Sequence, residues 1–560
     1  MNKQWEVFET DEEKAKLISE KFNLSMFISR LLVNKGIIED NEISVFINPT
    51  RNNFYDPFDM PDMKNAVDRV IKAIENKEKT IIYGDYDVDG ITSSVVLKSF
   101  LAERGLEADI YIPNRLNEGY GLNEKAVKEL AEKDYKLMIT VDCGITGNKE
   151  VELANNLGLD VVITDHHEPS KNLPNAIAVV DTKREDNKYP FRGLAGVGVT
   201  FKLIQAISMQ MNLPPEANLK YLDIVCIGTI SDIVPLQDEN RVISLLGLKL
   251  VKQTRNIGLK VLLDSIGYSQ IDSNTVSFGL APRINACGRM GHEKVAVDLL
   301  LTNNIRKARE LTEELNRYNQ ERQNIEKKIF EEAAQLAQQT KKHCIVVGKE
   351  NWHHGVIGIV SSKITEMLSK PSILLCYEDG MAKGSGRSIK GFDLHEALEN
   401  CEEYIEQFGG HSMAVGVTLK QENVEKFGEE LDKYATKMNI ETIVPILLID
   451  QKVELKDITI EDIKQLKILE PFGEANSVPL FQFSNLRIDA IRALSEGKHL
   501  KLTLKDENNK YLDVIGFNTG NLVEEYKIGE KVDVVGNLKI NYFNNQEMIQ
   551  LVLNDIRHTL

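Results

Sequence analysis

Short apolar runs, separated by polar turns and helical stretches, recur through the first half of the chain. They are TIIYG (80–84), ADIYI (108–112), LMITV (137–141), VVIT (161–164), AIAVV (176–180) and IVCIGTI (224–230). Each run has the length of a strand, and polar turns or stretches with helical spacing of apolar residues lie between them. Short strands that alternate with helices are typical of a parallel sheet covered by helices. The pattern therefore predicts an α/β domain in which all six runs are strands.

The flanking segments have other patterns. Short helices are predicted within residues 10–47, an amphipathic helix at 63–76 and further helices at 240–300. Residues 303–340 contain no glycine or proline and are highly charged, so one long helix is expected there. A second α/β pattern follows at 343–440, with a glycine-rich turn at 384–388. From about 445 short strands succeed one another, which predicts a small closed barrel.

The predicted fold class is thus α/β with an added all-β domain. We expect five parts: an N-terminal helical segment, a parallel-sheet catalytic domain, a connecting helix, a second α/β domain and a β-barrel. Their predicted bounds are 1–60, 61–302, 303–340, 341–445 and 446–560.

Composition narrows the class of protein. The chain has 560 residues, 42% of them hydrophobic and 27% charged, as in folded soluble proteins. No apolar run approaches the ~20 residues that span a bilayer, and the N-terminus has no apolar signal core. Six scattered cysteines without a C-x-x-C pair suit a reducing cytoplasm, which is the expected location. The net charge of −17 disfavours nucleic acid at long range, but a binding site depends on local charge, so that partner stays open.

Acidic and histidine residues follow four of the predicted strands. In chain order they are Asp85, Asp87 and Asp89; Asp142; Asp165, His166 and His167; and Asp232. A single aspartate after a strand is most often a turn residue or a helix cap. Turns and helix caps do not account for acidic or histidine residues at four strand ends of one sheet. The carboxyl ends of parallel strands face one crevice, where ligands bind. The sequence therefore predicts that these side chains converge.

Converging carboxylates repel one another unless cations lie among them. Carboxylate oxygens with few imidazoles and no thiols suit Mn²⁺ or Mg²⁺. There are more carboxylates than one such ion needs. Two ions ~3.5–4 Å apart, sharing one carboxylate, activate water in phosphoester hydrolysis. We therefore expect two ions and a hydrolytic site.

These motifs resemble those of the DHH phosphoesterase superfamily and, within it, the family of RecJ exonucleases. The resemblance rests on blocks in the same order along most of the chain. They include GDYDVDGITSS (84–94), PNRLNEGYGLN (113–123), GTISDIVPL (228–236), PRINACGRMG (282–291), KGSGRS (383–388), FGGHSMAVG (408–416) and LEPFGEANSVPLF (469–481). The resemblance implies a DHH catalytic domain, a DHHA1-type substrate-binding domain and a C-terminal oligonucleotide-binding (OB) fold.

The resemblance also implies roles for single residues. Asp87 would bind one ion and Asp89 the other, with Asp142 between them, and His166 and Asp232 would complete the second site. Asp85 and His167 would lie beside these ligands as supporting and orienting groups. The expected phosphate- and substrate-binding residues are Arg115, Arg283, Asn285, Arg289, Ser385, Arg387, Gly409, Gly410 and His411. In the barrel, Tyr511, Phe517, Tyr542 and Phe543 are candidates for stacking on bases.

The function that the resemblance implies is 5′→3′ hydrolysis of single-stranded DNA to nucleoside 5′-monophosphates, in DNA repair and recombination. It further implies a single-strand-binding protein and a helicase as partners, and we expect a monomer that does not bind membranes. One alternative is a phosphoesterase acting on oligoribonucleotides, cyclic dinucleotides or polyphosphate, for which the long helix and barrel are not needed. A second alternative is a non-catalytic replication scaffold, which predicts missing ligands, whereas every ligand position is filled.

Overall fold

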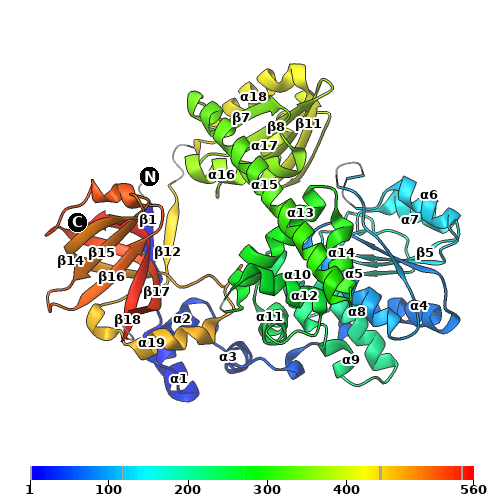
Figure 1. The fold of residues 1–560 in the computed structure, drawn as a ribbon, viewed down its shortest axis with the longest axis horizontal. Coiled ribbons are helices and arrows are strands. Elements are labelled where there is room, and N and C mark those ends of the chain that lie inside the picture. The colour runs from blue at the N-terminus through cyan, green and yellow to red at the C-terminus, as the bar shows by residue number, and fades with distance from the viewer. Residues whose placement is uncertain are drawn as a thin grey trace. The chain divides into compact units, whose positions relative to one another are not determined.

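The chain folds into two compact units, each built from segments that are distant in sequence (Figure 1). The structure is a computed structural model, and it describes residues 3–115, 118–119, 121–268, 270–440, 444–543 and 546–559. The first unit, here called the barrel unit, combines Met1–Phe54, Pro235–Leu245 and Pro445–Leu560. The second, the α/β unit, combines Tyr55–Val234 and Leu246–Val444. The predicted division of the chain into five parts stays a prediction.

The first sheet of the α/β unit has five parallel strands in the order β3-β2-β4-β5-β6. The strands are β2 (Thr80–Gly84), β3 (Asp109–Tyr111), β4 (Leu137–Val141), β5 (Asp160–Thr164) and β6 (Ala178–Val180). The central strands β2 and β4 are buried along their whole length, because helices cover both faces of such a sheet. Five of the six predicted strands are confirmed.

The sixth predicted strand is wrong, since residues 224–230 lie in helix α10 (Leu222–Ser231). Every residue from 222 to 230 is buried, so the helix has no polar face and its apolar run shows no helical period. Helix α10 packs against α5 (Val88–Ala102) and α8 (Gly196–Gln210). The other helices of this region are α4 (Met63–Asn76), α6 (Glu124–Glu132), α7 (Asn148–Asn156) and α9 (Glu216–Leu219).

A 35-residue helix, α15 (Ile305–Gln339), confirms the predicted long helix. It packs against three helices at one end and one at the other. They are α12 (Ile257–Ile266), α13 (Ala281–Arg289) and α14 (Glu293–Leu301), and α16 (His354–Leu368), respectively. Inside α15 the buried side chains of Arg322 and Glu326 form an ion pair that Lys363 of α16 joins. The helices that precede it are α11 (Asp238–Val251), α12 (Ile257–Ile266), a π-helical turn (Thr275–Leu280), α13 (Ala281–Arg289) and α14 (Glu293–Leu301).

The second sheet of the α/β unit has the order β10-β11-β9-β8-β7. Only β7 and β8 run parallel, and the other pairs are antiparallel. The strands are β7 (Ile345–Glu350), β8 (Ser372–Glu378), β9 (Met381–Arg387), β10 (Gln407–His411) and β11 (Ala414–Lys420). The helices are α16 (His354–Leu368), α17 (Leu394–Glu399) and α18 (Val424–Lys437).

The predicted glycine-rich turn at 384–388 is wrong, because all but its last residue lie in the central strand β9. Its main chain pairs with β8 on one side and β11 on the other, so it offers no ring of free N–H groups to an anion. The glycines serve packing instead. A Cβ on Gly384 would lie 2.5 Å from Leu375, and one on Gly386 2.8 Å from Val415.

The C-terminal strands form the predicted barrel, with the order β14-β15-β16-β18-β17 closed by pairing of β14 with β17. The strands are β12 (Ile446–Ile449), β13 (Gln451–Lys452), β14 (Phe481–Leu494), β15 (His499–Lys505), β16 (Tyr511–Gly516), β17 (Lys531–Phe543) and β18 (Gln546–His558). A short helix, α19 (Ile460–Gln465), precedes β14.

The N-terminal segment belongs to the barrel's core. Its helices α1 (Glu12–Phe22), α2 (Met26–Asn34) and α3 (Asp40–Ile47) place apolar residues in one cluster with the barrel, where the rings of Phe27 and Phe481 stack at 5.0 Å. A strand that the pattern did not predict, β1 (Gln4–Val7), pairs in parallel with β12. The buried Arg241 donates to the main-chain oxygens of Phe46 and Leu469 and so ties three segments together. Across the part of the chain that is described, no helix could cross a bilayer.

Candidate metal centre

The loop after β2 supplies three carboxylates. Asp85 follows the strand directly and is buried, Asp87 caps helix α5, and Asp89 lies in the first turn of that helix. The Oδ1 atom of Asp87 accepts hydrogen bonds from the N–H groups of Asp89 and Gly90, at 2.9 and 3.1 Å. Asp87 is therefore a helix cap, and its Oδ2 atom is available for a second role.

Asp89 is held by the N-terminus of another helix. Its Oδ2 accepts from the N–H of Gly196 at 2.6 Å and its Oδ1 from that of Val197 at 2.8 Å, both in the first turn of α8. Burial, with the charge of Asp87, raises the pKa of Asp89 to about 7 despite these hydrogen bonds. The N–H groups of α8 thus hold the Asp89 carboxylate in place, although burial and the charge of Asp87 disfavour its ionised form.

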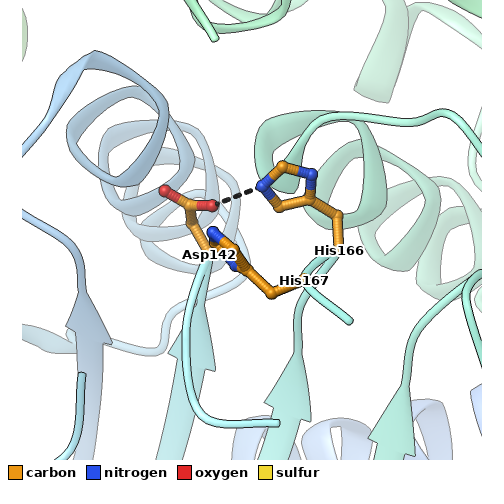
Figure 2. Close-up of side chains that lie close together, drawn as sticks. All are labelled: Asp142, His166 and His167. Carbon is orange, nitrogen blue, oxygen red and sulfur yellow. Dashed lines mark ion pairs between the residues drawn. The ribbon is translucent and has the colours of Figure 1, made fainter. Parts of the chain in front are cut away.

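Asp142 and His166 meet at the ends of neighbouring strands (Figure 2). The Nε2 atom of His166 lies 3.1 Å from Oδ1 of Asp142, 3.6 Å from Oδ2 of Asp232 and 3.9 Å from Oδ2 of Asp89. Burial lowers the pKa of His166 to about 3, so the imidazole is neutral and able to act as a ligand. Asp142 has a left-handed backbone, with φ of 61°, immediately after β4.

His167 is oriented by the carboxylate two residues before it. Its Nδ1 lies 2.7 Å from Oδ1 of the buried Asp165, which makes Nδ1 the protonated nitrogen. Burial opposes the charge of His167, but this hydrogen bond and the surrounding carboxylates raise its pKa. The two histidine rings lie 4.4 Å apart, so one neutral and one readily protonated imidazole stand side by side.

Asp232 reaches the same place from a helix rather than from a strand. It is the C-cap residue of α10, and its side chain is 19% exposed. The predicted convergence is therefore observed, although the predicted strand before Asp232 is absent. Burial and the charges of neighbouring carboxylates raise the pKa values of Asp85, Asp142 and Asp232 well above the usual range. Such a cluster needs positive charge to be stable with its carboxylates ionised.

The donor atoms form two sets that fit two cations. Asp85, Asp87 and Asp142 are one group with ligand atoms within 4.8 Å of one another, and Asp89, His166 and Asp232 are another. Asp142 also groups with His166 and His167, so it lies between the two sets. Within these two sets, four buried atoms make no hydrogen bond to the described part of the chain: Asp85 Oδ1, Asp142 Oδ1, His166 Nε2 and Asp232 Oδ2. Oxygen donors with one or two imidazoles are the set expected for Mn²⁺ or Mg²⁺.

A group of arginines lies in the same α/β unit. The pKa of Arg289 is lowered to about 10, by burial and by the charges of Arg115, Arg322 and Arg387. Arg322 pairs with Glu326, whereas Arg115 lies over the ring of Tyr86 at 4.9 Å and Arg387 donates to Ser385 Oγ at 3.1 Å. Guanidinium groups that lie close together can bind an anion such as phosphate. The structure therefore brings Arg115, Arg289, Arg387 and Ser385 together.

Other predicted substrate-binding residues have structural contacts. Arg283 donates to Asn316 Oδ1 at 2.7 Å and to the main-chain oxygen of Gly279. Asn285 accepts from the N–H of Val88 at 3.2 Å, so it supports the start of α5, which carries Asp87 and Asp89.

The predicted residues Gly409, Gly410 and His411 lie in β10, the exposed edge strand of the second sheet. Their described contacts do not include the metal-centre residues. Their role stays a prediction.

Two residues near the centre were missed by the sequence analysis. Asp181 follows β6, the fifth strand of the sheet, and is fully buried with Oδ2 unpaired. Burial raises its pKa to about 8. The strand-end pattern contained Asp181 and could have found it. Gly196, which contacts Asp142, gave no such signal, because only the folded chain brings it beside the carboxylate.

Comparisons with known proteins give three domain matches. The N-terminal domain of the DHH family matches residues 79–229, the DHHA1 domain matches 340–437, and the RecJ OB domain matches 449–555. The DHH match contains the strand ends that carry Asp85 to His167. The DHHA1 match contains the second sheet, and the OB match contains the barrel strands.

Several known proteins are similar to this chain over most of its length. The single-stranded-DNA-specific exonuclease RecJ of Bacillus subtilis is 40% identical over 559 residues, covering 98% of this chain and 70% of that protein. RecJ of Salmonella typhimurium is 32% identical, covering 88% and 89%. A crystal structure of Thermus thermophilus RecJ with Mn²⁺ matches with a TM-score of 0.87 and 28% identity, covering 100% of this chain and 80% of that one. A second structure of the same protein contains Mg²⁺ and has a TM-score of 0.81.

Proposed function

Because the chain belongs to the RecJ family, we propose that it is a metal-dependent exonuclease specific for single-stranded DNA, acting 5′→3′ and releasing nucleoside 5′-monophosphates. The observation that carries this proposal is the meeting of carboxylates and an imidazole at the carboxyl ends of β2, β4 and β5 and at the end of α10. The identity of the relatives supplies the substrate class, and the resemblance supplies the polarity and the products.

The residues that we propose as ligands follow the two donor sets. Asp87 would hold one ion, and Asp89, His166 and Asp232 the other, with Asp142 shared between them. Asp85 groups with Asp87 and Asp142, so we assign it to the support of the first ion. When bound, the two ions neutralise phosphate charge and make a bound water more acidic.

The chain's own groups then orient the reaction. The hydrogen bond to Asp165 directs the other ring nitrogen of His167, Nε2, away from that carboxylate, and we assign to it the orientation or protonation of the scissile phosphate. The hydrogen bond to Asp165 favours the protonated form of His167 that such a role needs. The neutral imidazole of His166 beside it keeps the ligand role.

Substrate is held at two further places in this proposal. Arg115, Arg289, Arg387 and Ser385 would bind the phosphate at the 5′ end, because uncompensated guanidinium groups gather there. In the barrel, exposed Tyr511, Phe517 and Tyr542 would stack on bases further along the strand. The side chain of Phe543 lies outside the described residues.

The alternatives fit less well. A phosphoesterase for small substrates needs no barrel, yet the RecJ OB domain matches residues 449–555. A non-catalytic scaffold would lack ligands, whereas all five proposed ligands are present and near one another. We therefore propose the exonuclease and not these functions.

The test uses end-labelled oligonucleotides with Mn²⁺ or Mg²⁺, and Asp142→Ala as the inactive control. We expect the 5′ label of a single strand to appear first, as a mononucleotide, while blunt duplex and RNA are cut slowly. Earlier release of the 3′ label would contradict the polarity. Comparable rates on blunt duplex and single strand would contradict the substrate class.

Partners and location are proposed on the resemblance and composition alone. We assign a single-strand-binding protein and a helicase as partners, a cytoplasmic location and a monomeric state. Size-exclusion chromatography with light scattering tests the monomer, and co-sedimentation with purified candidate partners tests the complexes.

A further inference from the structure

Ile233, the residue after the proposed ligand Asp232, has an unusual backbone and an unusual exposure. Its φ is 61°, in the left-handed region, and its side chain is 71% exposed. Among the described non-glycine residues with positive φ, Ile233 is the one with a β-branched side chain; most of the others are Asn, Asp or Ser. Asp142 and Ile233 both have a left-handed backbone. Asp142 lies beside His166, and Ile233 directly follows Asp232, which also lies beside His166.

Neither backbone preference nor packing explains an isoleucine at this position. A left-handed residue directly after a helix is usually glycine or asparagine, because a β-branched side chain collides with the main chain there. An exposed isoleucine gains little from burial in the protein itself. Strained residues of this kind occur where a functional contact requires them.

The position of Ile233 in the chain places it next to the proposed metal centre. Its Cα is about 3.8 Å from that of Asp232, and the carboxylate of Asp232 lies 3.6 Å from His166. A phosphodiester bound by these residues carries a sugar and a base on each side. A nucleobase next to the scissile phosphate is therefore within reach of a side chain that follows a ligand directly.

We propose that Ile233 is a positioning residue whose aliphatic side chain lies against the base that flanks the scissile phosphate and separates it from the next base. This inference rests on the proposed function. Isoleucine, leucine and methionine side chains act as wedges between stacked bases in other nucleic-acid complexes. Such a contact has no hydrogen-bond pattern, so it fits an exonuclease that must accept each base in turn.

The first measurement compares Ile233→Gly with the wild-type protein. Glycine removes the side chain and suits the left-handed backbone, so we expect Tm to rise by about 1–3 °C while kcat/KM on single strands falls about tenfold. A merely structural residue would not show stability and activity moving in opposite directions.

Two control variants distinguish the effect of relieving backbone strain from the effect of removing an exposed isoleucine side chain. Lys77→Gly makes the same change at another exposed left-handed position, the C-cap of α4 with φ of 50°. Ile177→Ala removes an exposed isoleucine just before β6, at the amino end of the sheet and away from the metal centre. Both variants should keep wild-type kcat/KM.

The decisive measurement is a double-mutant cycle with abasic substrates. A single abasic sugar is placed at each of the first three nucleotides from the 5′ end of an oligonucleotide, with every phosphate kept. In the wild type, removing the base that Ile233 contacts should lower kcat/KM about tenfold. In Ile233→Gly the same abasic substitution should have no further effect, because the contact is already lost.

The outcomes distinguish this inference from the function on which it rests. If the losses from Ile233→Gly and from each abasic substitution simply multiply, Ile233 does not touch a base and the inference is wrong, although the exonuclease stands. If Ile233→Gly lowers both Tm and activity, the residue is structural. If the wild type with Mn²⁺ does not degrade single strands, the proposed function itself is wrong.

Discussion

Gly196 and Asp142 are in such close contact that no side chain fits between them. A Cβ atom on Gly196 would lie 2.5 Å from Oδ1 and 2.6 Å from Cβ of Asp142. The N–H of the same glycine donates to Asp89 at 2.6 Å. One residue at the start of α8 therefore positions two of the proposed ligands, one by its hydrogen bond and one by its lack of a side chain.

We predict that Gly196→Ala disables the metal centre without unfolding the protein. The new methyl group must displace Asp142, and displacements of about 1 Å at a reacting centre cost about a hundredfold in rate. Calorimetric titration with Mn²⁺ should show weaker binding, together with a loss of that size in kcat/KM. Gly198→Ala is the control, because the atoms nearest to its Cβ belong to the side chain of Leu194, at 3.3 Å or more, and not to a proposed ligand. Wild-type Mn²⁺ affinity in Gly196→Ala would contradict the prediction.

Asp142→Asn should lower activity to a few per cent or less, because the shared carboxylate serves both ions. The same change should raise the Tm of the metal-free protein. Burial and the charges of Asp89, Asp87 and Asp232 all raise the pKa of Asp142, so the ionised carboxylate opposes folding when no cation is present. Thermal unfolding with EDTA and with Mn²⁺ measures both effects. Wild-type-like stabilisation by Mn²⁺ in the variant would show that Asp142 is not shared by two ions.

Asp181→Asn should stabilise the protein most at alkaline pH. Burial raises the pKa of Asp181 to about 8 in the folded state, compared with about 3.9 in an unfolded chain. A raised pKa gives stability that is complete below about pH 4 and is lost as the pH rises through about 8. An asparagine can still accept the 2.6 Å hydrogen bond from the N–H of Lys183 and carries no charge. We expect a gain of about 1–3 kcal/mol at pH 8 and little at pH 5, measured by urea unfolding; equal gains at both pH values would exclude this explanation.

Arg289→Ala should raise KM for single strands more than it lowers kcat. The guanidinium donates to the main-chain oxygen of Gly355 at 2.9 Å, and the charges of Arg115 and Arg387 act on it, so we expect it to contribute affinity for phosphate. The slope of log K against log salt should fall by about 1 for one lost phosphate contact. Arg283→Ala, on the same helix but bonded to Asn316 and Gly279, is the matched control and should leave that slope unchanged. A loss in kcat alone would place Arg289 in the chemical step instead.

Phe517→Ala should weaken binding to long strands and leave cleavage of very short ones unchanged. The ring is 52% exposed, and Lys539 Nζ lies 5.8 Å from its centroid, a combination that suits a stacked base beside a phosphate. Stacking contributes about 1–3 kcal/mol per base, which fluorescence anisotropy with a long labelled strand would detect. Ile528→Ala removes another exposed apolar side chain of the barrel unit, 67% exposed, and should have no effect. Equal losses on dinucleotides and long strands would mean that the barrel supports the catalytic fold.

Much of the fold followed from the hydrophobic pattern. The strands of the first sheet are apolar runs bounded by turns, and the long helix contains no residue that breaks it, so both could be predicted. The failures have a physical cause. Helix α10 is buried on all sides and has no period to detect, and the glycines of β9 are required by packing against Leu375 and Val415 rather than by a turn.

The candidate site was predicted as a set of residues but not as a geometry. Consecutive strand ends identified Asp87, Asp89, Asp142 and His166, and Asp232 was identified through an incorrect strand. The contact of Gly196 with Asp142 and the conformation of Ile233 depend on φ angles and on packing between distant segments. Neither quantity is encoded in residue spacing.

The barrel unit is completed only after its last strand, β18, has been made. Phe27 stacks on Phe481, so the ribosome adds 453 residues between the two partners. At ~5–20 residues per second that interval lasts roughly 20–90 s. During this time helices α1 to α3 expose the apolar side chains that later join the barrel's core. The nascent N-terminus is therefore a natural client for a chaperone, and a gene cut before the barrel would leave these helices permanently without their partner.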